Sequence, residues 1–258
     1  MKLGYDRLGS GPPLVLLHSL GTDRCVWHPV LEPLSREREV VAVDLPGFGE
    51  SDPLPPGQPP APLALAGAVA SFVRSLGIEE PPHMAGNSLG GWVALELGAG
   101  GRALSVTAIA PAGLWPRALP PKPSIARGVA RAARPVMAAV LARARGRRLA
   151  LGATMAHPER VPPREALRLV RAYAAAPGYD EVNAAMRAGR FAGLDRIRVP
   201  LTFGWPDRDR LVARPARLPA AARNVVLRGC GHVPMWDSPE QVTALLLEGS
   251  GARALHAA

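Results

Sequence analysis

Short apolar runs recur along the chain, separated by longer stretches in which apolar residues follow a helical spacing. The runs are continuous rather than alternating, which is typical of parallel strands covered on both faces by crossover helices. This alternation predicts a doubly wound, mostly parallel α/β sheet. The predicted strands are 14–17, 40–43, 83–85, 105–109, 199–203 and 224–227, and the predicted helices are 27–34, 64–76, 89–97 and 239–247.

The pattern changes between Ala112 and Arg190, where no strand-like run occurs and Ala, Arg and Pro dominate. We therefore predict a helical insertion at 112–190 between two parts of the α/β core, 1–111 and 191–258. Pro135 should split or kink its helix, because proline lacks an amide donor and clashes with the preceding turn. The segment is amphipathic, with Val129, Ala133, Val136 and Val140 at helical spacing and Arg127, Arg131 and Arg134 on another face.

The chain has 258 residues, 48% of them hydrophobic, which is enough for one substantial core. Its formal net charge is +10, and the excess lies in the insertion, which holds 15 Lys/Arg and 4 Asp/Glu. Two interpretations stay open. The abundance of Ala, Arg, Gly and Pro is typical of GC-rich genomes, which add arginines without selecting a ligand, whereas arginines facing a cleft would attract anionic substrates. Binding of nucleic acid fits the charge, but no motif supports it. A loose association with an anionic membrane surface stays open, without a feature of the sequence that supports it.

The N-terminal residues do not resemble a signal peptide, because Lys2 is followed by glycines, prolines and charged residues rather than by a long apolar run. The first apolar run, 14–17, is too short to span a membrane. We therefore expect a cytoplasmic protein without stable membrane insertion. In that reducing compartment Cys25 and Cys230 are expected to be free thiols.

Residues 86–90 read Gly-Asn-Ser-Leu-Gly and match the G-x-S-x-G pattern between a predicted strand and a predicted helix. A sharp strand-to-helix turn of this kind, the nucleophile elbow, strains the backbone of its serine. Side chains larger than glycine at positions 86 and 90 would collide with neighbouring backbone. Ser88 is therefore the candidate nucleophile.

A serine hydroxyl is a weak nucleophile until a base accepts its proton, and an acid must fix the tautomer of that base. His232 directly follows the last predicted strand and lies before the last predicted helix. Two aspartates follow the preceding strand. We favour Asp209, which stands before the Arg-Leu-Val turn into an expected helix, and assign Asp207 to a turn or cap. The order Ser88, Asp209, His232 predicts a catalytic triad.

Two further segments follow the first and second predicted strands, His-Ser-Leu-Gly at 18–21 and Asp-Leu-Pro-Gly-Phe-Gly-Glu-Ser at 44–51. With the serine motif and the late histidine, they resemble the ordered signatures of the alpha/beta-hydrolase superfamily over nearly the whole chain outside the insertion. The resemblance implies the alpha/beta hydrolase fold, with the insertion as its helical cap domain.

The resemblance also implies an oxyanion hole formed by the backbone amides of Leu20 and Leu89. Ser19 departs from the usual glycine at its position, and it either adds a side-chain donor or caps the local turn. Residues 44–51 are expected to be structural, with Asp44 anchoring their loop by hydrogen bonds.

The leading expectation is a carboxylesterase-like serine esterase that cleaves a small acyl substrate, neutral or anionic, through an acyl-enzyme on Ser88. No metal-ligand spacing occurs and no cofactor is expected. Trp115, at the start of the insertion, is the candidate for lining the substrate pocket. The basic residues at 127, 131 and 134 would favour anionic substrates if they face the cleft.

Other functions remain open for the same triad: carbon–carbon bond hydrolysis of a diketone-type ring-fission product, and acyl transfer. A non-enzymatic ligand receptor is disfavoured by the intact triad. Within the superfamily that the chain resembles, epoxide hydrolases and haloalkane dehalogenases use a carboxylate nucleophile, so the serine at position 88 argues against both. The sequence does not indicate an oligomeric state.

Overall fold

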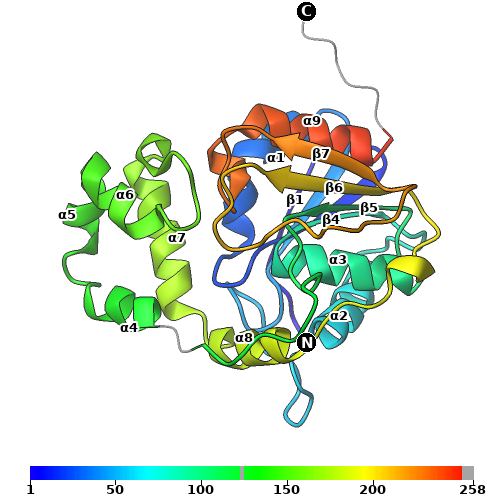
Figure 1. Ribbon diagram of the computed structural model, residues 1–258, viewed down its shortest axis with the longest axis horizontal. Coiled ribbons are helices and arrows are strands. Elements are labelled where there is room, and N and C mark those ends of the chain that lie inside the picture. Colours follow the sequence, from blue (N-terminus) through cyan, green and yellow to red (C-terminus); the bar gives the residue numbers. More distant parts are fainter. Residues whose placement is uncertain (123–124, 252–258) are drawn as a thin grey trace, which may run out of the picture.

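A seven-stranded sheet forms the centre of the described residues, 1–122 and 125–251, in the computed structural model (Figure 1). The spatial order of the strands is β1-β3-β2-β4-β5-β6-β7, and β1 is antiparallel to β3 while the other neighbours are parallel. The strands are β1 (Tyr5–Leu8), β2 (Pro13–Leu17), β3 (Glu39–Val43), β4 (His83–Asn87), β5 (Ser105–Ile109), β6 (Leu201–Pro206) and β7 (Arg223–Leu227).

Helices cover both faces of this sheet, as the continuous apolar runs predict. In β2, Val15 and Leu17 pack toward α2 and α3, and Leu14 and Leu16 pack toward α1 and α9. The sequence prediction of a doubly wound, mostly parallel α/β fold is confirmed. The four helices are α1 (His28–Ser35), α2 (Pro62–Ser75), α3 (Leu89–Ala99) and α9 (Pro239–Gly249), and short 3-10 helices lie at η1 (Arg24–Trp27), η3 (Leu194–Arg196) and η4 (Pro234–Trp236).

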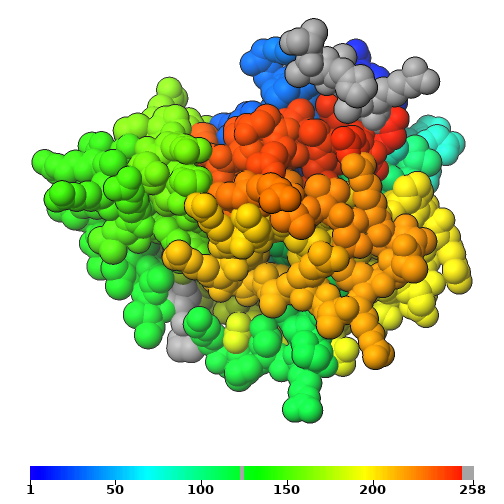
Figure 2. All heavy atoms as spheres, turned by 45° about the horizontal axis from the view of Figure 1, so that its top comes forward, coloured from blue at the N-terminus to red at the C-terminus, as the bar shows by residue number. Residues whose placement is uncertain are grey.

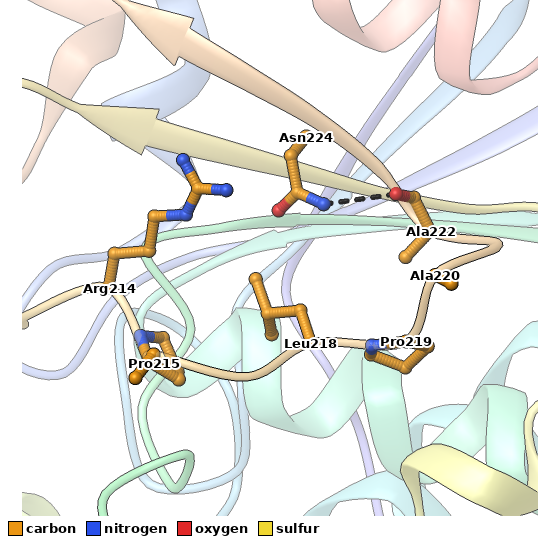
Figure 3. A pocket seen from close by; sticks show the side chains of 8 residues that line it. Arg214, Pro215, Leu218, Pro219, Ala220, Ala222 and Asn224 are labelled. Atoms are coloured by element: carbon orange, nitrogen blue, oxygen red, sulfur yellow. Dashed lines mark hydrogen bonds between the residues drawn. The ribbon is translucent and has the colours of Figure 1, made fainter.

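The connection from β6 to β7 differs from the prediction. The helix expected after the Arg-Leu-Val turn is absent from the described structure, where residues 212–222 are irregular. This segment is rich in proline, which lacks the amide donor that a helix needs. The resulting loop borders a hollow beside the sheet, into which Arg214, Leu218 and Asn224 project (Figure 3).

The segment between β5 and β6 is helical, and its helices α4, α5, α6 and α7 form one end of the molecule, green to yellow-green in Figure 1. The same end is green in Figure 2. The expected break at Pro135 is confirmed, because α4 ends before it and α5 begins after it. Helices α4, α5 and α6 each contact α7. The division at residues 112 and 190 stays a prediction. The elements are α4 (Ile125–Ala132), α5 (Met137–Ala142), α6 (Ala144–Leu151), η2 (Pro158–Arg160), α7 (Pro163–Ala175) and α8 (Tyr179–Ala188).

Cys25 and Cys230 are both free and buried, as expected from the sequence. Burial raises the pKa of each thiol to about 12. No helix within the described ranges is long and apolar enough to cross a membrane.

Candidate active site

Ser88 lies at the turn between β4 and α3 with φ 56° and ψ −111°, a conformation that non-glycine residues rarely adopt. Two glycines make the turn possible. A Cβ on Gly86 would lie 2.1 Å from the carbonyl oxygen of Gly90, and a Cβ on Gly90 would lie 2.1 Å from the carbonyl oxygen of Leu17. The steric argument made from the sequence for these two positions therefore agrees with the structure.

The first turn of α3 lies against the loop that follows β2, because Gly90 N donates to the carbonyl of His18 at 3.1 Å. Beside this contact, the amides of Leu20 and Leu89 donate to no acceptor among the described residues. Leu89 is the first residue of its helix, where amide groups lack intrahelical partners and the helix dipole favours negative charge. The oxyanion role expected for these two amides stays a prediction.

His232 and Asp209 are joined by a hydrogen bond from Nδ1 to Oδ2 of 2.8 Å. Both side chains are almost fully buried. The other carboxylate oxygen, Oδ1, accepts from the amides of Leu211 at 2.7 Å and Val212 at 3.1 Å. Asp207 instead accepts from the amide of Gly229 at 2.7 Å, so it braces the loop before the histidine.

The charge of Asp209 follows from these contacts. Burial alone would raise the pKa of its carboxyl, but the bonds from His232 and from the two backbone amides outweigh burial and lower the pKa below its usual value. A carboxylate can only accept, so Nδ1 of His232 carries the proton and Nε2 is left as an acceptor.

Ser88 and His232 form no hydrogen bond with each other in the part of the chain that the structure describes. They are nevertheless held close, because Asn87 Nδ2 donates to the carbonyl of His232 at 2.9 Å and to that of Ile109 at 3.2 Å. Asn87 occupies the variable position before the serine, so the sequence motif gave no reason to select it.

Asp237 is a second residue that the sequence did not indicate. It is buried, and its carboxylate accepts from the amides of Gly231 at 2.8 Å, Ala156 at 2.9 Å and His157 at 2.7 Å. It thus fastens the loop of His232 to the segment between α6 and η2. Asp237 stands shortly before Pro239, so its position in the sequence suggests a helix cap. That position does not indicate the contact with a segment distant in sequence.

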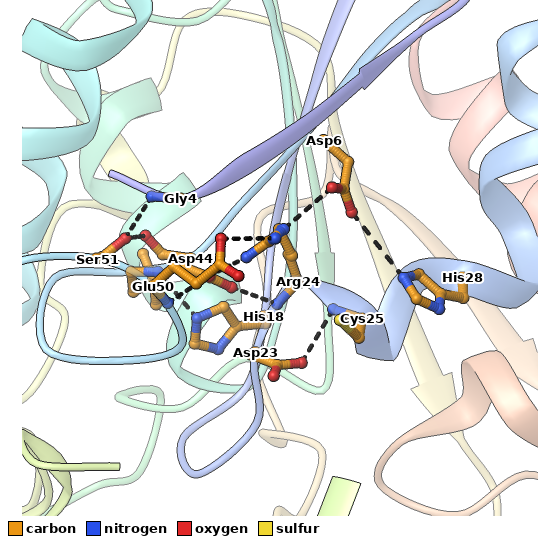
Figure 4. A network of polar contacts seen from close by, with 11 residues as sticks. Gly4, Asp6, His18, Asp23, Arg24, Cys25, His28, Asp44, Glu50 and Ser51 are labelled. Carbon is orange, nitrogen blue, oxygen red and sulfur yellow. Dashed lines mark hydrogen bonds and ion pairs between the residues drawn. The ribbon is translucent and has the colours of Figure 1, made fainter. Parts of the chain in front are cut away.

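Asp44 anchors its loop, as expected from the sequence (Figure 4). The side chain is fully buried and accepts from the amides of Arg24 at 2.7 Å and Glu50 at 2.9 Å, and it also pairs with the Arg24 guanidinium. Ser51 Oγ donates to the carbonyl of Asp44 at 2.6 Å. These bonds fix the loop after β3 beside the loop after β2.

His18 connects the same two loops. Its Nδ1 donates to the carbonyl of Ser19 at 2.8 Å, and its Nε2 accepts from the amide of Leu45 at 2.9 Å. Both contacts suit a neutral imidazole, and burial lowers the pKa of His18, which keeps it neutral. Ser19 Oγ pairs with Thr22 Oγ1 at 3.1 Å, the local-turn alternative considered for this residue.

The helical segment reaches the loop that carries Leu20. A Cβ on Gly21 would lie 2.7 Å from Cδ2 of Tyr173 and 3.0 Å from Cε2 of Tyr179, so both rings lie directly against this glycine. The two rings meet edge to face, with centroids 5.3 Å apart. Two aromatic rings therefore lie against the residue that follows Leu20.

Two other predictions concern the same segment. Trp115 packs edge to face on Trp92 with centroids 5.8 Å apart and donates from Nε1 to the carbonyl of Gly189 at 3.0 Å. Its role in a pocket stays a prediction. Arg127 is 2% exposed and donates to Tyr173 O at 3.2 Å, so it does not belong to an open basic face.

In the described residues, no group of three or more His, Cys, Asp or Glu could hold a metal ion.

Comparison with known proteins gives the same picture of the fold. A model of the alpha/beta hydrolase family matches residues 14–245. The epoxide hydrolase EphH of Mycobacterium tuberculosis is 39% identical over 183 residues, with coverage of 65% of this chain and 85% of that protein. A pimeloyl-[acyl-carrier protein] methyl ester esterase of Aeromonas hydrophila is 39% identical over 103 residues, covering 38% of this chain and 36% of the esterase. Among solved structures, a thermophilic esterase from Thermogutta terrifontis is similar with a TM-score of 0.72 and 25% identity, covering 95% of this chain and 92% of that one.

Proposed function

This chain belongs to the alpha/beta hydrolase family, and we propose that it is a serine hydrolase that cleaves an ester or related acyl bond through an acyl-enzyme on Ser88. The observation that carries the proposal is the hydrogen bond between His232 Nδ1 and Asp209 Oδ2. It leaves Nε2 of the imidazole as a base. A base oriented in this way is what a serine hydroxyl needs in order to become a nucleophile.

In the first half of the reaction, Ser88 Oγ attacks the acyl carbonyl carbon while His232 Nε2 takes the hydroxyl proton. The tetrahedral intermediate carries its negative charge on the former carbonyl oxygen. Collapse of the intermediate breaks the bond to the leaving group, which receives the proton from His232. An acyl-serine ester then remains on Ser88. The missing hydrogen bond between the two side chains is compatible with this step, because such bonds often tighten only when substrate is bound.

In the second half, water replaces the leaving group. His232 takes a proton from the water as its oxygen attacks the acyl-serine carbonyl, and the same proton returns to Ser88 Oγ when the ester bond breaks. The products are a carboxylic acid and the free enzyme. The imidazolium that forms twice in the cycle lies beside the Asp209 carboxylate, whose lowered pKa keeps it charged.

The amides of Leu20 and Leu89 are proposed to stabilise the oxyanion in both halves. Loss of one such donor typically costs roughly 100- to 1000-fold in rate. Backbone amides are difficult to remove by mutation, but their positions depend on side chains that can be changed. His18 and Asp44 hold the loop of Leu20, and Gly90 holds the turn of Leu89 against it.

The 112–190 insertion is proposed to act as a cap over this site. The support for this assignment is the contact of Tyr173 and Tyr179 with Gly21, next to the proposed oxyanion amide. A second contact lies nearby, where Gly178 N donates to the carbonyl of Gly47 at 3.0 Å. A small acyl substrate would then be bound between the aromatic pair and the loops after β2 and β3.

Epoxide hydrolysis is the second candidate, because EphH is named for that activity and aligns over most of its length. The chemistry of Ser88 disfavours it. Opening an epoxide with a serine oxygen forms an ether, and water does not cleave an ether by attack on a carbonyl. A carboxylate nucleophile would instead leave a hydrolysable ester. The serine therefore favours acyl substrates.

The test compares hydrolysis of short and medium-chain p-nitrophenyl esters with opening of an aryl epoxide. We expect the wild type to hydrolyse esters, to label with a fluorophosphonate probe and to leave epoxides unchanged. Ser88→Ala should lose both ester hydrolysis and labelling, and Ser19→Ala, a matched serine in the neighbouring loop, should keep labelling. Epoxide opening that survives Ser88→Ala, or a wild type that neither labels nor hydrolyses, would overturn the proposal.

A further inference from the structure

Helix α4 turns a charged side chain toward the protein and apolar side chains toward solvent. Arg127 is 2% exposed, whereas Ile125 is 76% and Val129 63% exposed. Ile125 and Val129 lie one turn apart on the same face, roughly opposite Arg127. A surface helix of a globular protein normally has the reverse arrangement, with the apolar stripe facing the core.

The contacts of the arginines fix this orientation. Arg127 donates to the carbonyls of Tyr173 and Ala176 and to Asp180, and its guanidinium lies 5.1 Å from the centroid of the Tyr179 ring. Arg131 Nε donates to the carbonyl of Ala174 at 2.8 Å. These carbonyls lie at and just beyond the C-terminal end of α7, where helix carbonyls lack intrahelical partners and cations are favoured. The outward direction of the apolar residues therefore follows from specific bonds.

The next two helices also expose aliphatic side chains, and α6 again buries an arginine. In α5, Met137 and Leu141 are buried while Val140, and Val136 just before the helix, are exposed. In α6, Arg147 is buried and donates to the carbonyls of Leu141 at 2.8 Å and Glu159 at 3.0 Å. We call the exposed apolar set of this region the outer apolar face; its members are Ile125, Val129, Val136, Val140 and Leu149, the last 85% exposed.

The residues that carry the outer apolar face are basic, and Glu159, just beyond them, pairs with Arg148 at 3.2 Å. Residues 125–158 contain seven arginines and no Asp or Glu. Five of these arginines are exposed, and the side chains of Arg134 and Arg145 among them form no hydrogen bond or ion pair within the described residues. All three helices lie at the end of the molecule away from the sheet (Figure 1). A surface that combines exposed aliphatic side chains with unopposed arginines is complementary to a surface that is both apolar and anionic.

We propose that the outer apolar face docks on an anionic phospholipid bilayer. The aliphatic side chains would enter the headgroup region, and the neighbouring arginines would pair with lipid phosphates. A second copy of this chain is a poorer occupant, because a symmetric contact would bring arginines of like charge together. Nucleic acid is also poorer, because its phosphates would pair with the arginines but leave the aliphatic groups exposed. This association is peripheral and independent of the chemistry proposed for Ser88.

The experiment measures co-flotation of the full chain with vesicles. We expect binding to equimolar phosphatidylglycerol and phosphatidylcholine, little binding to phosphatidylcholine alone, and weaker binding at high salt. Ile125→Ser/Val129→Ser should weaken binding by about tenfold or more. Leu63→Ser, which removes another strongly exposed leucine on α2, should leave binding unchanged.

A second pair of variants separates local charge from net charge. Arg134→Gln/Arg145→Gln should weaken vesicle binding, and Arg74→Gln/Arg102→Gln, with the same change in net charge at exposed sites elsewhere, should not. Circular dichroism, together with hydrolysis of a water-soluble ester if the wild type shows it, reports whether each variant is folded. The proposal is overturned by equal binding to both vesicle types, by equal effects of the two arginine pairs, or by light scattering that shows a dimer dissociated by Ile125→Ser/Val129→Ser.

Discussion

Asn87 Nδ2 lies 2.9 Å from the backbone carbonyl oxygen of His232 and donates a hydrogen bond to it. The residue before the proposed nucleophile thus holds the loop of the proposed base. Replacement by alanine leaves a buried carbonyl without this donor, at a cost of about 1–3 kcal/mol. We expect Asn87→Ala to lower kcat by roughly 10- to 100-fold with little change in KM, because the misplaced base acts in the transition state.

The control for this prediction is Asn224→Ala, which removes another asparagine side chain that accepts from Trp205 at 2.9 Å. It should reduce stability without changing kcat for ester hydrolysis. Steady-state kinetics and thermal unfolding of both variants are the measurements. An Asn87→Ala enzyme with wild-type kcat would show that the bond to the His232 loop does not position the base.

Asp209 and Asp207 provide a matched pair of substitutions two residues apart. Asp209→Asn removes the carboxylate that orients His232 and should reduce kcat by about 10⁴-fold, whereas Asp207→Asn should leave kcat near the wild-type value. Equal losses in the two variants would contradict the assignment.

The lowered pKa of Asp209 also predicts a dependence of stability on pH. The carboxylate contributes to the free energy of unfolding above the ordinary carboxyl value of 3.8, and the contribution disappears as pH falls through the lower value of the folded protein. The difference in unfolding free energy between wild type and Asp209→Asn should therefore shrink only in strongly acidic solution. Chemical denaturation across the acidic range measures this difference.

Asp237 should stabilise the insertion and the His232 loop together. Asp237→Ala leaves three backbone amides without their acceptor, and each unsatisfied buried group costs about 1–3 kcal/mol. We expect faster hydrogen exchange at residues 156–157 and at Gly231 in this variant. Asp237→Asn retains one acceptor oxygen and should recover part of the protection. If exchange at the two segments responded independently, Asp237 would not be the connection between them.

His18 should make the protein less stable in mild acid. Because burial holds the pKa of His18 below its ordinary value of 6.5, its contribution is complete above pH 6.5 and is lost as pH falls toward the lower folded value. One such proton gives a slope of at most about 1.4 kcal/mol per pH unit. His18→Gln should be less stable than wild type near neutral pH and should show a smaller slope.

His83→Gln is the matched control for the histidine prediction, because burial also lowers the pKa of His83, which pairs with Ser105 Oγ at 2.8 Å. His83→Gln should also reduce the slope of the free energy of unfolding against pH. Only His18→Gln should also slow ester hydrolysis, since His18 alone of the two joins the loops after β2 and β3. Equal activity in both variants would contradict this positioning role.

The sequence predicted the buried centre of the fold well because each central strand is a short continuous apolar run. It missed β1, whose residues at 5–8 are mostly exposed and form no apolar run at the edge of the sheet. It also placed a helix after Asp209 where prolines prevent one. The conformation of edge strands and connections depends on neighbours that are distant in sequence. The local pattern of residues does not identify those neighbours.

The candidate site shows the same limit. Ser88, His232 and Asp209 stand in motifs with fixed relations to strand ends, so their order could be recognised. Asn87 and Asp237 form hydrogen bonds with backbone groups of distant segments. Because every residue has backbone groups, the sequence does not identify such partners. Helix α4 is the clearest case, because its periodicity is evident but only the carbonyls at the end of α7 decide which face points inward.

The carboxylate of Asp237 limits how freely this protein could be recombined with others. A chimaera that exchanged residues 112–190 for a foreign segment would remove Ala156 and His157, whose amides occupy both oxygens of a buried acid. Unless the graft presented two amides in the same places, the retained residues 1–111 and 191–258 would contain a buried carboxylate bonded only to the amide of Gly231. Exchange of the insertion is therefore expected to require simultaneous redesign of position 237.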